Sequence, residues 1–357
     1  MKKIYRRCYL KKVKILMILI LSIFLLSSCN NKTIKGEKVY VYNWGEYIDE
    51  SVLKSFEEDT GIKVIYEQFT QNEDMYMKIK EGGSTYDLIF PSDYMVERLI
   101  EEGMIQPINM DNIPNIKNIG KEYLNMEYDS EQKYSIPYFW GTVGILYNEK
   151  LVDDKVDSWE ILWNKKYAHK IIMMDSTRDS IGIALIKNGF SMNSRNLKEL
   201  EIAKKDLIKQ KPIVRAYLVD EMKGQMVNNE AALAPAYSGD AMDAMSENPD
   251  LKYIVPKEGT NLWFDSMAIP KNAKNVKNAE KFINYILEPE NAAKIAEYIG
   301  YSSPNIEAVK LLDEEIQNSK VAYPDLSTLG KLEIFKNPRD INSVYSEIWA
   351  EVKAADF

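Results

Sequence analysis

The hydrophobic positions of the N-terminal half alternate between short apolar runs and amphipathic segments. Runs rich in β-branched and aromatic residues predict strands at 39–42, 63–69 and 86–90. Apolar residues at helical spacing predict a helix capped by Asp49, a second capped by Asn72 and a third that runs from 91–94 to Glu102. Strands and helices that alternate through short links favour a parallel α/β sheet.

The second half repeats this alternation after an extended run at 134–147, which Gly141 and Gly144 interrupt. There the pattern predicts strands at 170–174, 231–235 and 252–255, and helices at 158–163, 180–188, 197–210 and 221–228. A second extended run at 261–270 leads back, and helices follow at 278–287, 290–299 and 343–355. Two crossings between two α/β units predict a hinged cleft, which closes around a ligand.

We therefore expect an α/β protein with two lobes, each a mostly parallel sheet flanked by helices. The ligand site of such a protein lies in the cleft between the lobes, beyond the carboxyl ends of strands. Residues 38–141 and 265–310 are assigned to lobe 1, and residues 142–264 and 311–357 to lobe 2.

Residues 1–28 have the features of an export signal. Seven basic residues and no acid lie between Met1 and Lys14, and the apolar run at 15–26 is short for a membrane span. The run ends in Leu26-Ser-Ser-Cys29, which looks like a lipoprotein lipobox. We expect cleavage before Cys29, lipid on that cysteine and a polar tether at 29–38. The alternative is an uncleaved signal anchor with an incidental cysteine.

Cleavage there would remove all seven basic residues and change the formal charge from -8 to -15. An acidic exported protein favours cationic ligands and disfavours nucleic acid as a partner. Cys8 and Cys29 are the two cysteines, so the mature chain has no pair for a disulfide. With His169 as the one histidine, a histidine-rich metal site or a Ser-His-Asp triad is hard to build. We therefore expect no metal and no cofactor.

The segment 261–270 combines a ring and a carboxylate. Trp263 and Asp265 are two residues apart, so on an extended strand both project from one face. An aromatic plane beside an anion suits an organic cation. The apolar residues 267–269 that follow favour burial in a core, up to Pro270. The alternative is a buried strand in which Asp265 only caps a neighbouring helix.

These residues belong to a series of motifs that resembles the spermidine/putrescine-binding proteins of polyamine ABC transporters. No single motif is decisive, but the series runs in order from about Val39 to the C-terminus. Its members are YNWGEY (42–47), TGIKVIY (60–66), YDL (86–88), PSDY (91–94), YSIPY (134–138), WFDSMAIP (263–270) and IGYSSPN (299–305). The resemblance implies a type 2 periplasmic-binding-protein fold.

In that family, rings flank the methylenes of the ligand and carboxylates hold its amines. Position by position, the resemblance implies six rings, two acids and a supporting serine: Trp44, Tyr47, Tyr94, Tyr237, Trp263 and Tyr301, Asp179 and Asp265, and Ser92. A diamine needs apolar walls for its methylenes and anions for its ammonium ends, so the chemistry agrees.

Several of these residues also have a purely structural alternative. Trp44 could be a core residue, Tyr47 and Tyr94 could cover surface, Asp179 could cap a helix that starts near Ser180, and Tyr237 and Tyr301 could serve packing.

The chain departs from the spermidine-binding pattern at four positions. Ser176 stands where a second acid precedes Asp179, Tyr237 replaces a tryptophan, and a glutamine expected near the C-terminus aligns near Phe335. Asp240 stands where a serine is usual and resembles the putrescine-selective branch, so we add it to the ligand-binding residues. These departures leave the preferred polyamine open.

The expected function is that of an extracytoplasmic substrate-binding protein, not an enzyme, that delivers polyamine to an ABC permease. We expect a monomer held to the outer face of the cell membrane, or to the periplasmic side if an outer membrane exists, by lipid on Cys29. One alternative is a receptor of the same fold for iron, sulfate or a sugar. The other is an exported carbohydrate-active enzyme, since rings and paired acids also suit a sugar site.

Overall fold

The structure, a computed structural model, describes residues 36–82 and 85–355. The predicted signal segment and Cys29 lie outside these residues. The strands are β1 (Lys38–Trp44), β2 (Lys63–Phe69), β3 (Leu88–Ile89), β4 (Ile105–Gln106), β5 (Ser135–Asn148), β6 (Ile171–Met174), β7 (Val214–Leu218), β8 (Leu233–Tyr237), β9 (Leu251–Ile254), β10 (Thr260–Pro270) and β11 (Leu332–Glu333).

Helices cover this sheet on its faces. They are α2 (Glu50–Thr60), α3 (Asn72–Glu81), α4 (Asp93–Glu101), α5 (Thr177–Lys187), α6 (Leu197–Gln210), α7 (Glu221–Val227), α8 (Ser238–Glu247), α9 (Val276–Ile286), α10 (Pro289–Ile299), α11 (Ile306–Val309), α12 (Glu314–Gln317) and α13 (Asn342–Ala354). The segment between β4 and β5, predicted to be irregular, forms short 3₁₀ turns.

The sheet is mixed, and its order is β2-β1-β3-β10-β5-β8-β6-β7. β1 pairs in parallel with β2 and β3, and β6 pairs in parallel with β7 and β8. β5 and β10 are antiparallel to each other and stand between the two parallel sets. The expected α/β class with parallel strands in each lobe is therefore confirmed, with two antiparallel strands added at the centre.

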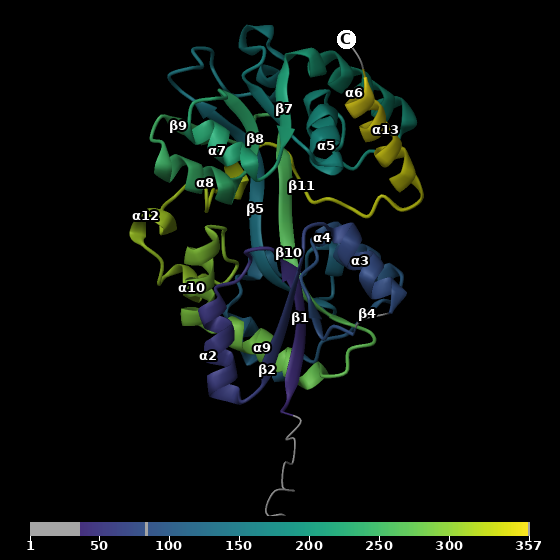
Figure 1. Cartoon of the computed structure of the whole chain (residues 1–357), viewed down its shortest axis with the longest axis vertical. Coiled ribbons are helices and arrows are strands. Elements are labelled where there is room, and N and C mark those ends of the chain that lie inside the picture. Colours follow the sequence, from purple (N-terminus) through teal and green to yellow (C-terminus); the bar gives the residue numbers. More distant parts are fainter. Residues whose placement is uncertain (1–35, 83–84, 356–357) are drawn as a thin grey trace, which may run out of the picture.

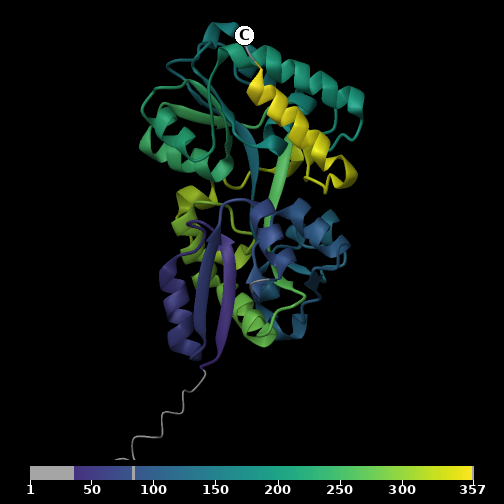
Figure 2. The same ribbon diagram turned by 45° about the vertical axis from the view of Figure 1, so that its right-hand side comes forward.

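Two lobes are visible in Figure 1, and β5 and β10 run between them. Lobe 1 holds β1, β2 and α2–α4 with α9 and α10, and lobe 2 holds α5–α8 with α13. The turned view in Figure 2 shows the same two bodies, with α13 lying against helices of lobe 2. The lobes are thus joined by the two long strands that the sequence predicts as crossings. Their residue boundaries stay a prediction.

The two crossing strands are buried along almost their whole length. Every residue of β10 is buried, and in β5 only Tyr147 is not fully buried. Met267, Ala268 and Ile269 have no exposed surface, as their apolar pattern predicts. Strands covered on both faces read as continuous apolar runs, so a polar side chain in β10 needs a specific partner.

Local signals place most helix ends correctly. Asp49 caps α2 by accepting the Ser51 N–H, and Gly61 ends the helix in the left-handed conformation. The prediction for Asn72 is wrong: Gln71 is the N-cap of α3, and the Asn72 amide instead binds Ser92. Among the described residues, no helix is both long and apolar enough to cross a bilayer.

Candidate functional site

β10 presents Trp263 and Asp265 toward the junction of the lobes. Both lie before a bulge between Asp265 and Ser266, so their i, i+2 spacing is kept. The extra residue is Tyr138 of β5, because Asp265 pairs with Phe139 and Ser266 with Pro137, which has no N–H to donate to the ladder. Each of the two side chains is only 8% exposed.

Asp265 is held by two hydroxyl groups from lobe 1. Tyr47 donates its OH to Oδ2 at 2.7 Å, and Ser92 donates its Oγ–H to Oδ1 at 2.6 Å. The neighbouring Asp93, and not Asp265, takes backbone N–H groups, from Tyr94 and Phe264. The alternative role of Asp265 as a helix cap is therefore not what this structure shows.

Asp179 lies in the first turn of α5, where Ser176 is the N-cap. Its Oδ2 accepts from the Ser176 Oγ–H at 2.5 Å and from the Tyr237 OH at 3.0 Å. The helix begins before the position predicted, so the hydroxyl of Ser176 carries out the capping and leaves the Asp179 carboxylate directed at Tyr237.

Asp240 belongs to the first turn of α8, a helix that is not among those predicted from the sequence. Its first residues, Ser238 and Gly239, are weak helix formers, and packing easily overrides helix propensity. Tyr301, from lobe 1, donates its OH to Asp240 Oδ1 at 2.9 Å. Its ring lies against Gly239, where an added Cβ would fall 1.5 Å from ring carbon Cδ1.

The rings form a continuous chain around Trp263. The centroid of Trp263 lies 5.3 Å from that of Tyr301 and 5.9 Å from that of Tyr237, both edge to face. Tyr301 in turn lies 5.9 Å from Tyr47. Gly141 makes room for the indole, because a Cβ there would fall 2.6 Å from Trp263 Cζ2. The structure therefore brings together Tyr47, Ser92, Asp179, Tyr237, Asp240, Trp263, Asp265 and Tyr301, which we call the acidic-aromatic cluster.

Burial governs the electrostatics of the cluster. It raises the pKa of Asp265 to about 6 and that of Asp240 to about 6, although hydrogen bonds from Ser92, Tyr47 and Tyr301 act in the opposite direction. Burial also raises the pKa of Asp179. The pKa values of the hydroxyls of Tyr47, Tyr237 and Tyr301 are raised as well, so these groups stay protonated and donate.

None of the three carboxylates forms an ion pair with a lysine or arginine among residues 36–82 and 85–355. The nearest cation in sequence, Arg178, lowers the pKa of Asp179 only as a minor effect. Its guanidinium instead stacks on Phe335 and Tyr345, with centroid distances of 4.6 and 4.9 Å, and donates to Asn193. The cluster thus holds two buried carboxylates and one half-buried carboxylate without an ion pair to any basic residue that the structure describes.

Two predicted site residues stand at the margin. The ring of Trp44 packs on Phe69 at 4.5 Å, and its Nε1 is buried without a partner in the described part of the chain. Tyr94 donates its OH to Glu73 at 3.1 Å, and its ring lies 5.9 Å from the Arg178 guanidinium. No hydrogen bond or ring contact given by this structure joins either residue to the cluster.

Sequence reasoning missed three residues that shape the cluster. Gly239 makes room for Tyr301, Arg178 fills the space between Tyr94 and Phe335, and Asn72 positions Ser92. A glycine directly before Asp240 was the one available signal. The other two act across elements far apart in sequence, so no local pattern marks them.

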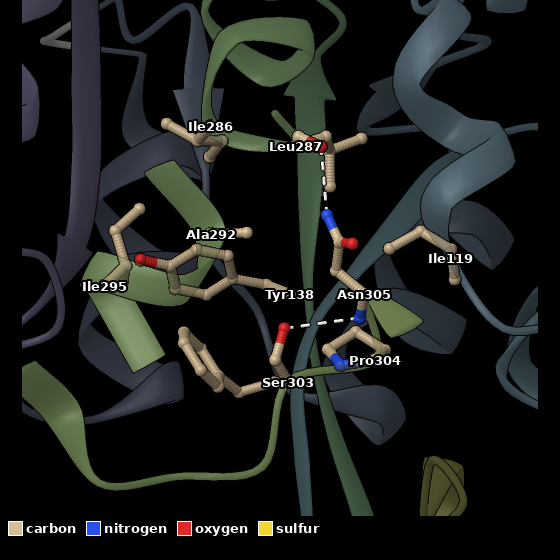
Figure 3. Close-up of a pocket in the computed structure, with 10 residues that line it drawn as sticks. Ile119, Tyr138, Ile286, Leu287, Ala292, Ile295, Ser303, Pro304 and Asn305 are labelled. Carbon is tan, nitrogen blue, oxygen red and sulfur yellow. Dashed lines mark hydrogen bonds between the residues drawn. The ribbon is translucent and has the colours of Figure 1, made fainter. Parts of the chain in front are cut away.

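A separate small cavity lies inside lobe 1, behind Tyr138 and the turn at Ser303 (Figure 3). It is lined mostly by apolar residues, and its free volume of about 10 Å³ holds at most one water. Asn305 donates to Leu287 O at 2.9 Å on one side of it and from its backbone to Ser303 Oγ on the other. This void belongs to packing, not to the acidic-aromatic cluster. In the described residues, no three His, Cys, Asp or Glu side chains gather as metal ligands.

Comparison with known proteins identifies relatives of this chain. A spermidine/putrescine-binding periplasmic protein of Salmonella typhimurium is 39% identical over 321 residues, covering 89% of this chain and 92% of that protein. A solved structure from Listeria monocytogenes, assigned to a spermidine/putrescine ABC transporter, is 43% identical with a TM-score of 0.85, and covers 89% of this chain and 99% of its own.

A second solved structure is the substrate-binding protein PotD of a spermidine/putrescine ABC transporter from Streptococcus pneumoniae. It is 44% identical with a TM-score of 0.79, and the match covers 89% of this chain and 98% of that one. The family resemblance and fold inferred from the motifs are thereby confirmed. Residues 51–324 match the family model described as bacterial extracellular solute-binding protein. The chain belongs to this family, whose members bind solutes outside the cytoplasm and are not enzymes.

Proposed function

We propose that the protein captures a polyamine and delivers it to the permease of an ABC transporter. The observation that carries the proposal is a set of three carboxylates that lack an ion-pair partner in the described structure and lie among aromatic rings: Asp179 and Asp265, which are buried, and Asp240, which is half-buried. A buried carboxylate is costly unless a cation compensates it. An alkyl chain with ammonium ends supplies the cations and an apolar middle for the rings.

The relatives support the same ligand class. The Salmonella and Streptococcus proteins are named for spermidine and putrescine. Among the runner-up functions, a sulfate receptor requires donors or basic groups at its site, whereas this cluster is acidic. An exported carbohydrate-active enzyme disagrees with the solute-binding family to which the chain belongs.

The choice among polyamines depends on how the carboxylates are placed. Ser176 removes one acid from the spermidine pattern, and its hydroxyl binds the remaining one, Asp179. Asp240 adds an acid next to Tyr301 and Tyr237. Because Asp240 Oδ2 has no hydrogen bond within the described structure, it is free to accept an ammonium. We therefore propose that the site binds putrescine at least as well as spermidine.

A ligand panel tests the function directly. Putrescine, spermidine, sulfate, ferric iron and maltose are each added to the purified protein, and its melting temperature is measured. Every ligand that raises the melting temperature is then titrated by calorimetry. A specific ligand stabilises the folded state by mass action, by about 2.7 kcal/mol at a concentration 100 times its Kd. Stabilisation by a sugar or anion and not by either polyamine would contradict the proposal. Product analysis after incubation checks that the polyamine is unchanged.

The anchor, location and assembly are further proposals. The lipobox at residues 26–29 supports lipid on Cys29, on the outer face of the cell membrane or in the periplasm where an outer membrane exists. The family supports a location outside the cytoplasm. We propose that the protein acts as a monomer that docks on the permease subunits.

Cys29→Ser tests the anchor. Without the thiol no lipid is attached, so we expect the variant to appear in the soluble fraction after cell fractionation, while the wild type stays with membranes. A variant that remains membrane-bound with unchanged gel mobility would show that the apolar run at 15–26 is itself the anchor.

A further inference from the structure

Five exposed lysines lie at or near the start of three elements of lobe 1, namely β1, β2 and α9, and Figure 1 shows the start of β1 at the end of lobe 1 that is farthest from lobe 2. We call this group the lysine tip; it consists of Lys38, Lys63, Lys274, Lys277 and Lys281. Lys38 and Lys63 are register partners at the start of β1 and β2. Asn278, in the first turn of α9, donates Nδ2–H to the Lys38 carbonyl at 2.9 Å and so joins the third segment to this pair. Figures 1 and 2 show the described chain entering the fold at the same end.

Local stability does not explain the lysines on α9. Lys277 lies in the first turn of the helix, where the partial positive charge of the peptide dipoles disfavours a cation. That turn has no acidic residue and no side-chain cap. The one acid between 271 and 281 is Glu280, which is 3% exposed and bound to the Asn109 N–H and to Asn112.

The acids near the tip compensate it only in part. Exposed acids at this end are Glu37, Glu58 and Asp59, and Asp59 accepts from the Tyr285 OH at 2.8 Å. Among the described residues, no ion pair joins any of the five lysines to an acid. Lys204 of α6 differs, because it pairs with Glu201 and Glu351. In a chain with a formal charge of -8, an end with five exposed lysines and three exposed acids is locally basic, and such a surface favours an anionic partner.

We propose that the lysine tip rests on the anionic phospholipid headgroups of the membrane to which the protein is tethered. The inference rests in part on the proposed anchor, since Lys38 is only nine positions after Cys29. A tether of that length spans at most about 30 Å, so this end of lobe 1 cannot move far from the bilayer. Each lysine held near an anionic surface increases binding by about fivefold, and one acyl chain with a basic patch is a sufficient pair of membrane signals.

A lysine footprint tests the contact. The purified full-length mature lipoprotein is reconstituted into vesicles of phosphatidylcholine alone or with about one third phosphatidylglycerol, and acetylation of each lysine is followed by mass spectrometry. We expect Lys63, Lys274 and Lys277 to react severalfold more slowly on the anionic vesicles, and the protection to vanish at high salt because exposed charges are then screened. Lys198, Lys205 and Lys209 on α6, of which Lys205 pairs with Glu201, serve as exposed control lysines and should react equally on both.

Variants give the second measurement. The triple change Lys63→Gln, Lys274→Gln, Lys277→Gln should abolish the salt-dependent preference for anionic vesicles, whereas Lys198→Gln, Lys205→Gln, Lys209→Gln should keep it. Equal protection on both vesicle types would overturn the proposal, as would equal protection by a soluble polyanion in the absence of vesicles. Polyamine titration of the same preparation reports separately on the proposed function. Footprinting of the protein without lipid on the same vesicles separates the contribution of the lysine tip from that of the proposed anchor.

Discussion

Asp265, which is buried, and Asp240, which is half-buried, are both carboxylates bound by a tyrosine hydroxyl, yet they are held in different ways. Asp265 has a donor on each oxygen, Tyr47 and Ser92, and both donors belong to lobe 1. Asp240 has one donor, Tyr301, which reaches it from the opposite lobe. We therefore expect Asp265 to stay positioned in an open and in a closed cleft, and the surroundings of Asp240 to be complete only when the lobes meet.

From this difference we expect the two carboxylates to serve separate parts of binding. A charge whose partners are already in place loses little freedom when an ammonium arrives, so Asp265 should supply most of the affinity. The contact of a ligand with a carboxylate whose surroundings form on closure depends on the length of the ligand, because the ligand must fit between the closed lobes. Asp240 should therefore control selectivity more than affinity.

The largest effect is expected from Asp265→Asn. The amide keeps the shape of the side chain but removes a charge-assisted contact, which costs about 1.5–3 kcal/mol, so polyamine affinity should fall by at least about tenfold. Isothermal titration measures the loss, and the melting temperature of the free protein checks the fold. Asp313→Asn, at an exposed position, is the matched control and should bind normally. Unchanged affinity in Asp265→Asn would end its assignment as the main anchor.

Acidification should act on both carboxylates. Each has a pKa raised to about 6, so each is protonated below that pH and no longer attracts an ammonium. Between pH 7 and pH 5 affinity should fall on the order of tenfold per carboxylate. The stability of the free protein should move the opposite way. A raised folded-state pKa contributes stability that is fully present below about pH 4 and is lost as pH rises through 6.

Titrations and denaturant unfolding at pH 5, 6 and 7 check both trends. Asp240→Asn should reduce the pH dependence of both the affinity and the free energy of unfolding. The difference in pH dependence between wild type and variant then isolates the contribution of Asp240 from that of every other titrating residue. A wild type whose affinity is the same at pH 5 and pH 7 would show that these carboxylates do not hold the amines.

Gly239→Ala tests the dependence on closure. The new Cβ would fall 1.5 Å from the Tyr301 ring, which is rigid, so the ring must leave the position where it binds Asp240. Overpacking of this kind costs about 1–3 kcal/mol, and we expect roughly a tenfold loss of affinity with a wider separation of the lobes in small-angle scattering. Gly224→Ala, on α7 with open space around it, is the control. Normal binding by Gly239→Ala would mean that Tyr301 and Asp240 need not meet.

The smallest effect, and the sharpest for selectivity, is expected from Asp240→Ser. Putrescine affinity should fall several-fold more than spermidine affinity, because the diamine loses one of few anchors while the triamine keeps contacts elsewhere. Paired titrations of both ligands against wild type and variant measure the ratio. If both affinities stay the same, Asp240 serves only as the hydrogen-bond acceptor for the Tyr301 hydroxyl. In that case no residue of the cluster replaces the acid that is absent at Ser176.

Local sequence patterns predicted most of the fold, because the conformation of most helices and strands is the one that their own residues favour. The strands 63–69 and 135–148 and the helices α2 and α6 follow from apolar spacing, caps and glycines. The strand β7 escaped prediction, since its residues are only partly buried and show no clear alternation. α8 escaped because its first residues favour a turn, and packing against β5 and β9 decides its conformation.

For the site, the sequence by itself determined the chemistry: one strand that carries Trp263 beside Asp265, further rings and acids at predicted element ends, and a family of motifs that connects them. The tertiary structure alone decided the pairing, in which Tyr47 meets Asp265, Tyr237 meets Asp179, and Tyr301 meets Asp240. The partners are separated by 218, 58 and 61 positions, so no spacing along the chain can encode their contact. The kinds of side chain at the site can be read from the sequence, whereas a hydrogen bond between distant segments depends on how the two lobes pack.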